Sequence, residues 1–211
     1  MNARLAPGRQ AAKSAATRQK LVDAAIALVR AQGYNATSID QLCAHAGVTK
    51  GAFFHHFANK DALAAEAARY WGRRANAMFG EDVGEARPDP LDRVLAYVDQ
   101  RSAMMDGTLA GCSCYAGTTV QEAYDSSMEL REACREAIFG HAASLEPDIE
   151  AALEVHGVEG VSAPGLALHI QAVIQGAFVI AKADSGFDHA HASMTHLRRY
   201  IELLFKRGKT S

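Results

Sequence analysis

Apolar residues recur every three or four positions along most of the chain, which is the spacing of one face of an α-helix. No segment shows the strict alternation of apolar and polar residues that is typical of a half-buried strand. The pattern therefore predicts an all-α protein. The first predicted helix ends at Gly33, because glycine commonly stops a helix at its C-terminus. Its apolar stripe consists of Leu21, Val22, Ala25, Leu28 and Val29.

A second, shorter helix is predicted for about residues 38–45. A side-chain oxygen before a helix can satisfy a free main-chain N–H three residues later, and a polar side chain there can return the bond. Two pairs of residues fit this capping pattern, Thr37 with Asp40 and Ser38 with Gln41. Both pairs place the start of the helix at the same point of the chain.

Two further helix starts follow closely. Gly47 supplies a turn, and Thr49 can cap a third helix that runs to about Phe57. Asn59 can cap a fourth helix, with Asp61 near its positive end. Two short helices joined by a glycine turn are typical of a helix-turn-helix.

The remainder of the chain continues in helical patterns. Pro147 is expected to kink or split one of these helices, because proline removes a donor and clashes with the preceding turn. Segments 84–90 and 157–164 are predicted as a linker and a loop. The predicted helices lie at about 90–106, 110–123, from 127 onward, 165–184 and 189–206.

The net charge of −2 hides an uneven distribution. Residues 1–60 contain eight Lys and Arg against two acidic residues, which gives +6, whereas the remaining residues contain fourteen basic and twenty-two acidic residues, which gives −8. A positive segment can neutralise phosphates while a negative body stays away from them. The asymmetry favours a nucleic-acid partner. Residues 1–14 are rich in Ala, Gly, Arg and Gln and are predicted to form a basic flexible arm.

In the predicted helix-turn-helix, one face of each helix must be buried. Ile39, Leu42 and Ala46 supply that face on the first helix, and Val48, Phe53 and Phe57 supply it on the second. The face that remains on the second helix begins with Thr49, Lys50, Gly51 and Ala52. Small residues there let the backbone approach the major groove, and Lys50 can then reach a phosphate or a guanine edge.

This region resembles the Tet repressor family. The resemblance covers about Arg18 to Leu63 and implies about nine helices, of which the first three bind DNA. It also implies that residues 15–62 form the DNA-binding domain and residues 63–206 form an effector-binding and dimerisation domain. The matching segments are Ala36-Thr37-Ser38-Ile39-Asp40-Gln41-Leu42, Ala46-Gly47-Val48-Thr49-Lys50-Gly51, His55-His56-Phe57 and Lys60-Asp61-Ala62-Leu63.

The resemblance also assigns roles to individual residues. Thr37 or Ser38 would bind phosphate at the start of the second helix, and Lys60 would hold a phosphate at the start of the fourth. The family usually has tyrosine where this chain has Phe54, so a phosphate-directed hydroxyl is absent and an apolar contact to a thymine methyl or a sugar takes its place. The predicted DNA contacts are Thr37, Ser38, Thr49, Lys50, Gly51, Ala52, Phe54, His55, His56 and Lys60.

Two apolar stripes near the C-terminus fit a homodimer through helices 165–184 and 189–206. Packing within one chain would produce the same stripes, and the pattern alone does not separate the two cases. A two-fold dimer would place two recognition helices one DNA turn apart, on a palindromic operator. The stripes consist of Leu166, Ile170, Val173, Ala177 and Ile180, and of Met194, Leu197, Ile201, Leu204 and Phe205.

The segment Gly111–Gly117 contains two cysteines and is a candidate for the lining of an effector pocket. Cys112 and Cys114 have three alternative roles: small buried residues, thiols that sense oxidants or electrophiles, or metal ligands with His141, His169 or Cys134. A thiol at a helix N-terminus would have a lowered pKa. The candidate pocket residues are Tyr97, Met104, Met105, Cys112, Cys114, Tyr115, Tyr124, His169, Gln175 and Phe178.

The sequence thus predicts a DNA-binding transcriptional regulator and not an enzyme, most consistent with a repressor that a small-molecule or thiol-reactive effector releases from its operator. The alternative is a cysteine-dependent hydrolase or transferase with Cys112 as nucleophile and His169 or His141 as base. No metal and no cofactor are predicted. Neither a signal peptide nor a run of about 18 apolar residues is recognised, so a cytoplasmic location and no membrane contact are expected.

Overall fold

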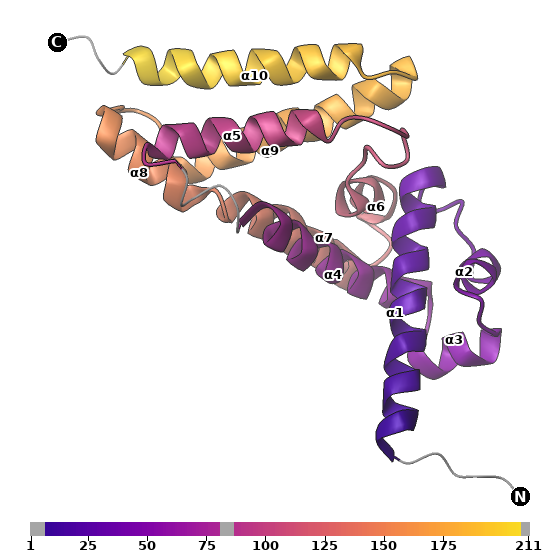
Figure 1. The fold of residues 1–211 in the computed structure, drawn as a ribbon. Coiled ribbons are helices and arrows are strands. Elements are labelled where there is room, and N and C mark those ends of the chain that lie inside the picture. Colours follow the sequence, from indigo (N-terminus) through magenta and orange to yellow (C-terminus); the bar gives the residue numbers. More distant parts are fainter. Residues whose placement is uncertain (1–6, 81–86, 208–211) are drawn as a thin grey trace, which may run out of the picture.

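The computed structural model describes residues 7–80 and 87–207, and these residues form ten α-helices and no strand (Figure 1). The prediction of an all-α protein is confirmed. The sequence analysis expected about nine helices. The difference arises at Pro147, where the long helix predicted from residue 127 is divided into α7 and α8. The helices are α1 (Pro7–Gln32), α2 (Ile39–Ala46), α3 (Lys50–His56), α4 (Lys60–Gly80), α5 (Pro90–Ala103), α6 (Tyr115–Ala123), α7 (Met128–Ala143), α8 (Glu146–His156), α9 (Ala163–Asp184) and α10 (Asp188–Arg207).

The first helix is longer than the sequence analysis expected. Residues 7–14, which were predicted to belong to a flexible arm, are helical and continue into the rest of α1. The Ala, Gln and Lys residues of this stretch are strong helix formers, and proline is well tolerated at the first helical position. The prediction of an arm is therefore wrong for this stretch, and its residues 1–6 lie outside the described residues.

A reciprocal cap fixes the start of α2. The Ser38 side chain accepts a hydrogen bond from the Gln41 main-chain N–H at 3.2 Å, and Gln41 Oε1 accepts one from the Ser38 N–H at 2.8 Å. Of the two predicted pairs, Ser38 with Gln41 is therefore the one that forms. Thr37 is buried, and its hydroxyl donates to the Gly33 carbonyl at 2.7 Å.

The other predicted starts and turns are also confirmed. Gly47 ends α2 with a φ of 64°, a left-handed conformation that glycine adopts without strain. The Thr49 hydroxyl accepts from the Ala52 N–H at 3.2 Å, and Asn59 Oδ1 accepts from the Ala62 N–H at 2.8 Å. These caps set the short α2–α3 unit and the start of α4 from local sequence alone.

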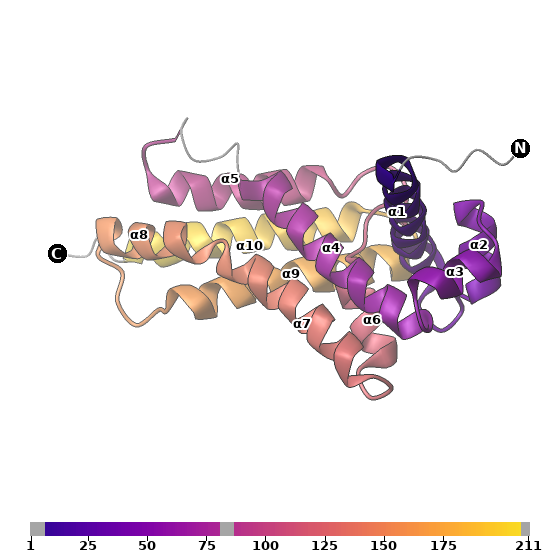
Figure 2. The same cartoon turned by 90° about the horizontal axis from the view of Figure 1, so that it is seen from below.

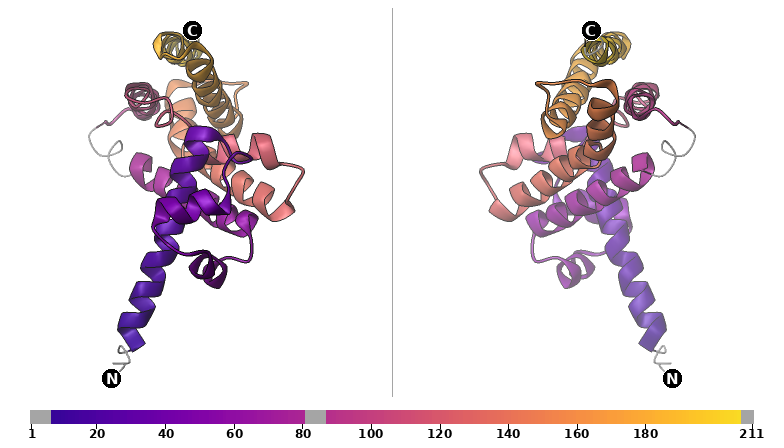
Figure 3. Two further views of the ribbon diagram at one scale, coloured as in Figure 1. Left: turned by 90° about the vertical axis from the view of Figure 1, so that its right-hand side faces the viewer. Right: turned by 90° about the vertical axis from the view of Figure 1, so that its left-hand side faces the viewer.

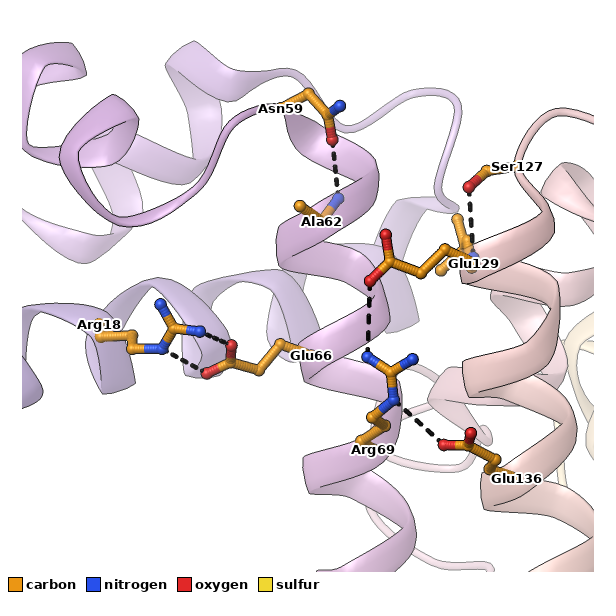
Figure 4. A network of polar contacts seen from close by, with 9 residues as sticks. Arg18, Asn59, Ala62, Glu66, Arg69, Ser127, Glu129 and Glu136 are labelled. Atoms are coloured by element: carbon orange, nitrogen blue, oxygen red, sulfur yellow. Dashed lines mark hydrogen bonds and ion pairs between the residues drawn. The ribbon is translucent and has the colours of Figure 1, made fainter.

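α4 and α7 run side by side through the middle of the molecule (Figures 1 and 2). Gly72 makes their close contact possible, since a Cβ atom at this position would lie 3.0 Å from the Ala137 Cα. Arg69 of α4 forms ion pairs with Glu136 at 3.1 Å and Glu129 at 3.6 Å, both on α7 (Figure 4). α4 is thus fixed along most of its length to a helix of the C-terminal region.

The helices are arranged around two apolar clusters. One lies among α5, α8, α9 and α10, and α10 is on the side of the molecule away from α2 and α3 (Figures 1 and 3). The other joins α1–α4 to α6 and α7, and it places Tyr115 and Cys134 in the same core as Phe53 and Leu63. The second cluster crosses the predicted domain boundary at residue 62. α6 and α7 therefore support the N-terminal head, which consists of α1, α2, α3 and the start of α4.

α9 differs from the expectation that no segment is apolar enough to span a bilayer. By length and composition alone it qualifies, with an 18-residue window of mean hydropathy 1.5. Core helices of soluble proteins pass the same test, and 39% of this window is buried inside the molecule. α9 packs against α7, α8 and α10, and one side of the helix is buried there, with Leu166, Ile170 and Ile174 in the core.

Candidate nucleic-acid interface and ligand cavity

The start of α3 is an exposed surface held in place by a buried residue. Phe53 is fully buried in the head, whereas Thr49, Lys50 and Gly51 are exposed and Ala52 is half-buried. The predicted contact residues at the start of α3 therefore lie together on the outside of the molecule. Ser38, at the start of α2, is exposed as well.

Lys50 forms an ion pair with Asp40 of α2. Its Nζ lies 2.7 Å from Asp40 Oδ1, and both side chains are exposed. The hydrogen bond and the negative charge of Asp40 raise the pKa of Lys50. The pair bridges the two helices of the helix-turn-helix across the Gly47 turn. Asp40 therefore binds the same ammonium group that a DNA phosphate would bind.

The far end of α3 carries an exposed aromatic residue and two histidines. Phe54 is 55% exposed, and its ring meets the edge of buried Phe53 at a centroid distance of 5.2 Å. His55 is exposed and contacts the half-buried His56. Partial burial and the neighbouring His55 lower the pKa of His56. Phe54 thus presents an apolar face to the outside, at the position where the family has tyrosine.

Lys60 is half-buried and is bound within the head. Its Nζ donates to the carbonyls of Tyr34 at 3.0 Å and Thr37 at 3.1 Å, and it lies 4.0 Å from the centre of the Tyr34 ring. Burial lowers the pKa of Lys60. Lys60 therefore ties the start of α4 to the turn between α1 and α2. Burial of Thr37 removes it from the predicted contacts, because its hydroxyl already serves the end of α1.

Arg18 is a residue of the head that the sequence analysis did not single out. It forms a two-point ion pair with Glu66 of α4 (Figure 4), and its Nη1 donates to the His56 carbonyl at 3.1 Å. The guanidinium also lies 4.6 Å from the centre of the Phe57 ring. Arg18 of α1 thereby contacts both the end of α3 and α4, and it connects these two helices to each other.

A cavity of about 220 Å³ lies where α1, α4, α5, α7 and α9 meet. Five of the ten predicted pocket residues line it, namely Met104, Cys112, Cys114, Gln175 and Phe178. A second hollow of about 260 Å³ shares Cys114, Gln175 and Phe178 with the first. Sequence reasoning missed most of the polar and aromatic lining, because these residues come from helices far apart in the chain. The missed residues include Arg30, Trp71, Arg74, Phe79, Arg101, His141 and Gln171.

The other five predicted pocket residues lie elsewhere. Met105 and Tyr115 are buried core residues, and the Tyr115 hydroxyl donates to the Ala64 carbonyl at 3.3 Å. Tyr124 is 61% exposed beyond α6, and His169 is exposed on α9, where it contacts the ring of Tyr200. The helical pattern identified these residues as unusual, but it could not assign them to one side of a helix. Their prediction as pocket residues is wrong.

Tyr97 lies behind the cavity wall, in a chain of hydrogen bonds through four helices. Gln171 Nε2 donates to the Tyr97 oxygen at 2.7 Å, and the Tyr97 hydroxyl donates to His141 Nε2 at 2.9 Å. His141 Nδ1 in turn donates to Asn76 Oδ1 at 2.8 Å. This tautomer follows from the acceptor at Asn76. Burial and the charge of Arg101 lower the pKa of His141 to about 4, so the ring is neutral near pH 7.

Arg30, in the last turn of α1, reaches from the head into the cavity. Its Nε donates to the Ser113 carbonyl at 2.9 Å, and its Nη2 donates to the Gly111 carbonyl. Its guanidinium lies 4.7 Å from the centre of the Trp71 ring. The end of α1 is therefore attached directly to the turn that carries Cys112 and leads into α6.

The two cysteines of this turn have different environments. Cys112 is buried, and burial raises the pKa of its thiol even though Arg101 and Arg30 oppose the shift. The predicted activation by a helix N-terminus is therefore wrong for Cys112. Cys114 is half-buried at the N-cap of α6, where its sulfur accepts the Gly117 N–H at 3.4 Å. Burial raises the pKa of Cys134 to about 12. Across residues 7–80 and 87–207, no three His, Cys, Asp or Glu side chains gather as metal ligands would.

α9 and α10 share an apolar face outside the lining of the cavity of about 220 Å³, although Val179 of this face also lines the second hollow. The stripes predicted for a dimer are mostly buried within the chain, as at Ile170, Ala177 and Ile201. Other apolar residues of the same helices are exposed, and contact between the rings of His169 and Tyr200 joins the two helices on this side. The large apolar residues on this face are Leu168, Val179, Ile180, Tyr200 and Leu203.

This molecule has a capped helix-turn-helix on an all-helical body that contains a cavity. These features place it in the class of helix-turn-helix regulators. Residues 21–67 match the family model of the bacterial regulatory proteins of the tetR family, and residues 90–189 match the C-terminal domain of LmrA/YxaF-like transcriptional regulators. The chain belongs to the TetR family.

Named relatives agree with this assignment. The chain is 29% identical to the uncharacterised regulator YxaF of Bacillus subtilis over 119 residues and 31% identical to its regulator LmrA over 122 residues. These matches cover 56% and 57% of this chain, and only 62% and 64% of the two relatives. The repressor NemR of Escherichia coli is 27% identical over 195 residues, which cover 88% of this chain and 94% of NemR. The crystal structure of reduced NemR has the same fold, with a TM-score of 0.74 at 23% identity over 87% of this chain and 96% of that one.

Proposed function

We propose that this TetR-family regulator is a repressor that binds a palindromic operator as a homodimer and is released by a small-molecule or thiol-reactive effector. The observation that carries DNA binding is the exposed start of α3, where Thr49, Lys50 and Gly51 lie together above buried Phe53. Helix N-terminal N–H groups and a nearby ammonium favour phosphate and base edges in the major groove. Ser38, the exposed cap of α2, is the second proposed phosphate contact.

The charge distribution supports this orientation on DNA. The first 60 residues have a net charge of +6 and the others −8, so the head is attracted to the polyanion and the body is repelled. Phe54 and His55 are exposed at the far end of α3 and are proposed to contact a sugar or a thymine methyl and the backbone. A cytoplasmic location follows from this function.

The exposed face of α9 and α10 supports the homodimer. Exposed apolar residues on two neighbouring helices mark a protein contact, and a two-fold axis would assemble four helices from two chains. Such a dimer would place the two α3 helices one DNA turn apart, roughly 34 Å. The predicted helices and Ile180 are retained in this proposal, while the other contact residues change to those on the exposed side. Val179 and Leu203 are the most exposed aliphatic residues there.

The cavity is the proposed effector site, and two structural links connect it to the head. Arg30 joins the end of α1 to the turn before α6. α4 lines the cavity with Trp71 and Phe79, and its other end is bound to α1 through Glu66 and Arg18. An effector that changes the position of α4 would therefore change the spacing of the recognition helices. Cys114 is the thiol proposed to react with an electrophile, since it lines the cavity at the start of α6. Such coupling requires unequal binding to the two states.

The cysteine-dependent enzyme is the weaker hypothesis. His141 lines the cavity with Cys112, but both of its ring nitrogens already have partners, Tyr97 and Asn76. His169 does not line the cavity. A general base needs a free nitrogen within reach of the nucleophile, and neither histidine provides one to Cys112.

An electrophoretic mobility shift with DNA from upstream of the chain's own gene tests the proposal. Lys50→Ala is expected to weaken binding and to reduce the slope of log affinity against log salt by about 1, because one phosphate contact is lost. Arg131→Ala is the matched control, since Arg131 is exposed on α7. Wild-type protein that shifts no DNA at low salt, or a Lys50→Ala variant with unchanged salt slope, would contradict the proposal.

A further inference from the structure

Three arginines from three helices line the cavity of about 220 Å³: Arg30 from α1, Arg74 from α4 and Arg101 from α5. No Asp or Glu is among the described lining residues. None of the ion pairs among the described residues involves any of the three arginines. The cavity therefore concentrates positive charge that no described carboxylate neutralises.

Two of the three guanidinium groups, those of Arg30 and Arg101, lie over aromatic rings and keep N–H donors free. The Arg101 guanidinium lies 4.7 Å from the centre of the Phe79 ring and 5.6 Å from that of Phe178. Contact over a ring uses the face of a guanidinium and leaves its edge available for hydrogen bonds. The Arg101 Nε is buried and has no hydrogen-bond partner among the described residues. A buried donor without a partner is costly, so an acceptor from a ligand would be stabilised here.

The rest of the wall is apolar, and it sets the shape of the ligand. Ile26, Met78, Phe79, Ile138 and Phe178 face the same cavity as the arginines. A dry cavity of about 150 Å³ holds one benzene molecule, so this cavity has room for a body of one or two rings. Neutral His141 adds no charge at pH 7. An apolar wall with a few convergent polar groups is typical of a small-molecule site.

We propose that the cavity binds an aromatic carboxylate of one or two rings. Its ring lies against the apolar wall and its carboxylate lies among Arg30, Arg74 and Arg101. Arginine matches a carboxylate with two parallel, charge-assisted N–H bonds, whereas a neutral amide has one acceptor oxygen and no charge, and a cation is repelled. The proposal names the chemical class of the effector, and in that respect it rests on the proposed function. Binding itself is measured without DNA.

Such a ligand would act on the link between head and body. Arg30 is hydrogen bonded to the carbonyls of Gly111 and Ser113 and has further N–H donors available. A carboxylate near Arg30 attracts its guanidinium toward the cavity, in competition with these two carbonyls. Since these bonds attach the end of α1 to the turn before α6, the anion would weaken this attachment.

The experiment is isothermal titration calorimetry of the full chain with 2-naphthoate, 2-naphthamide and 2-naphthylmethylammonium, which share one ring system and differ in charge. Naphthoate is expected to bind roughly 10- to 100-fold more tightly than the amide, the range for charge-assisted hydrogen bonds, and the cation most weakly. Arg101→Met is expected to remove most of this preference without changing the affinity for the amide. Arg74→Met, at an exposed position, is a second variant with little risk to folding. Arg131→Met on α7, outside the cavity lining, is the control and should keep the wild-type preference.

The outcomes separate the ligand class from the proposed function. Equal or tighter binding of the amide or the cation, no binding of naphthoate, or an unchanged preference in both Arg101→Met and Arg74→Met would overturn the inference. Tight binding of naphthoate with no effect on the DNA complex supports the ligand class and contradicts release by this effector. Release of DNA by 2-naphthamide alone supports the proposed function and overturns the aromatic anion.

Discussion

The carboxylate of Glu122 on α6 accepts a hydrogen bond from the main-chain N–H of Asn35, with 2.7 Å between Oε2 and the nitrogen. Asn35 lies in the turn between α1 and α2, 87 positions away in the sequence. Glu122 also covers Gly33, where a Cβ atom would lie 2.4 Å from Glu122 Oε1 and where φ is +91°. The helix that begins at the cavity is thus in direct contact with the turn that precedes α2.

Glu122→Ala is expected to release this turn. The Asn35 amide should exchange its hydrogen faster, and the free energy of unfolding should fall by about 1 kcal/mol, the net value of one such hydrogen bond. Hydrogen exchange and urea unfolding measure the two effects. Asp125→Ala, at an exposed position just beyond α6, is the control. Unchanged protection of Asn35 in the Glu122 variant would show that this contact does not hold the turn.

Two glycines of the α4–α7 region should respond oppositely to alanine. At Gly72 a Cβ atom would lie 3.0 Å from the Ala137 Cα, so Gly72→Ala forces α4 and α7 apart and should lower the free energy of unfolding by about 1–2 kcal/mol. At Gly140 on α7 nothing lies within 4 Å, so Gly140→Ala should raise it by about 0.5–1 kcal/mol through helix propensity. Urea unfolding of both variants checks the difference in sign. Stabilisation by Gly72→Ala would contradict the close crossing.

His141 should make stability depend on pH. Its folded-state pKa of about 4 lies below the unfolded value of 6.5, so the unfolded chain binds the proton more readily between these values. The stabilisation of the folded state that comes from this difference in pKa is fully present above pH 6.5 and is lost as the pH falls toward 4. From pH 7 to pH 5 the loss is about 2 kcal/mol.

The matched measurement is the free energy of unfolding of wild type, His141→Gln and His169→Gln at pH 7 and pH 5. His141→Gln should have a smaller loss between the two pH values than wild type. His169 is exposed, and its variant should follow wild type. Equal pH dependence of wild type and His141→Gln would exclude the neutral buried ring as its cause.

The proposed dimer predicts that charges on the shared face of α9 and α10 separate the chains. Val179 is 54% exposed and Leu203 52%, so the double variant Val179→Glu, Leu203→Glu should stay folded and become monomeric. Analytical ultracentrifugation gives the oligomeric state, and circular dichroism checks folding. Phe139→Glu, at a 49% exposed position on α7, should remain dimeric. A double variant that is still dimeric would place the interface elsewhere.

Asp40 should limit the affinity for DNA through its ion pair with Lys50. Asp40→Asn removes the negative charge that lies 2.7 Å from Lys50 Nζ, so the ammonium is free to bind a phosphate. The affinity for the operator is expected to rise by about 2- to 5-fold, as for the loss of one exposed ion pair. Asp92→Asn, exposed on α5, controls for the change in net charge. An unchanged or weaker complex would indicate that the pair positions Lys50 rather than competing for it.

Local sequence was sufficient for the elements of the head. Caps and turns depend on residues within three or four positions of one another, so Ser38 with Gln41, Gly47, Thr49 and Asn59 set α2, α3 and the start of α4 before any tertiary contact is considered. The same reasoning was wrong about the arm at residues 7–14. The composition of this stretch is similar to that of a flexible tail, but most of its residues are strong helix formers and the stretch extends α1.

Tertiary structure decided which face of each helix does what. A period of three to four residues identifies apolar positions but not their partner. The α9 and α10 stripes predicted as a dimer contact therefore contain core residues such as Ile170 and Ile201, and of their residues only Ile180 lies on the exposed apolar face. The cavity depends on Arg30, Arg74 and Arg101, which the sequence separates by 44 and 27 positions and the crossing of α1, α4 and α5 brings together. The sequence alone determined the helices and the helix-turn-helix, because hydrogen bonds between near neighbours specify them. Only the packing of distant helices decided the ligand cavity and its charge.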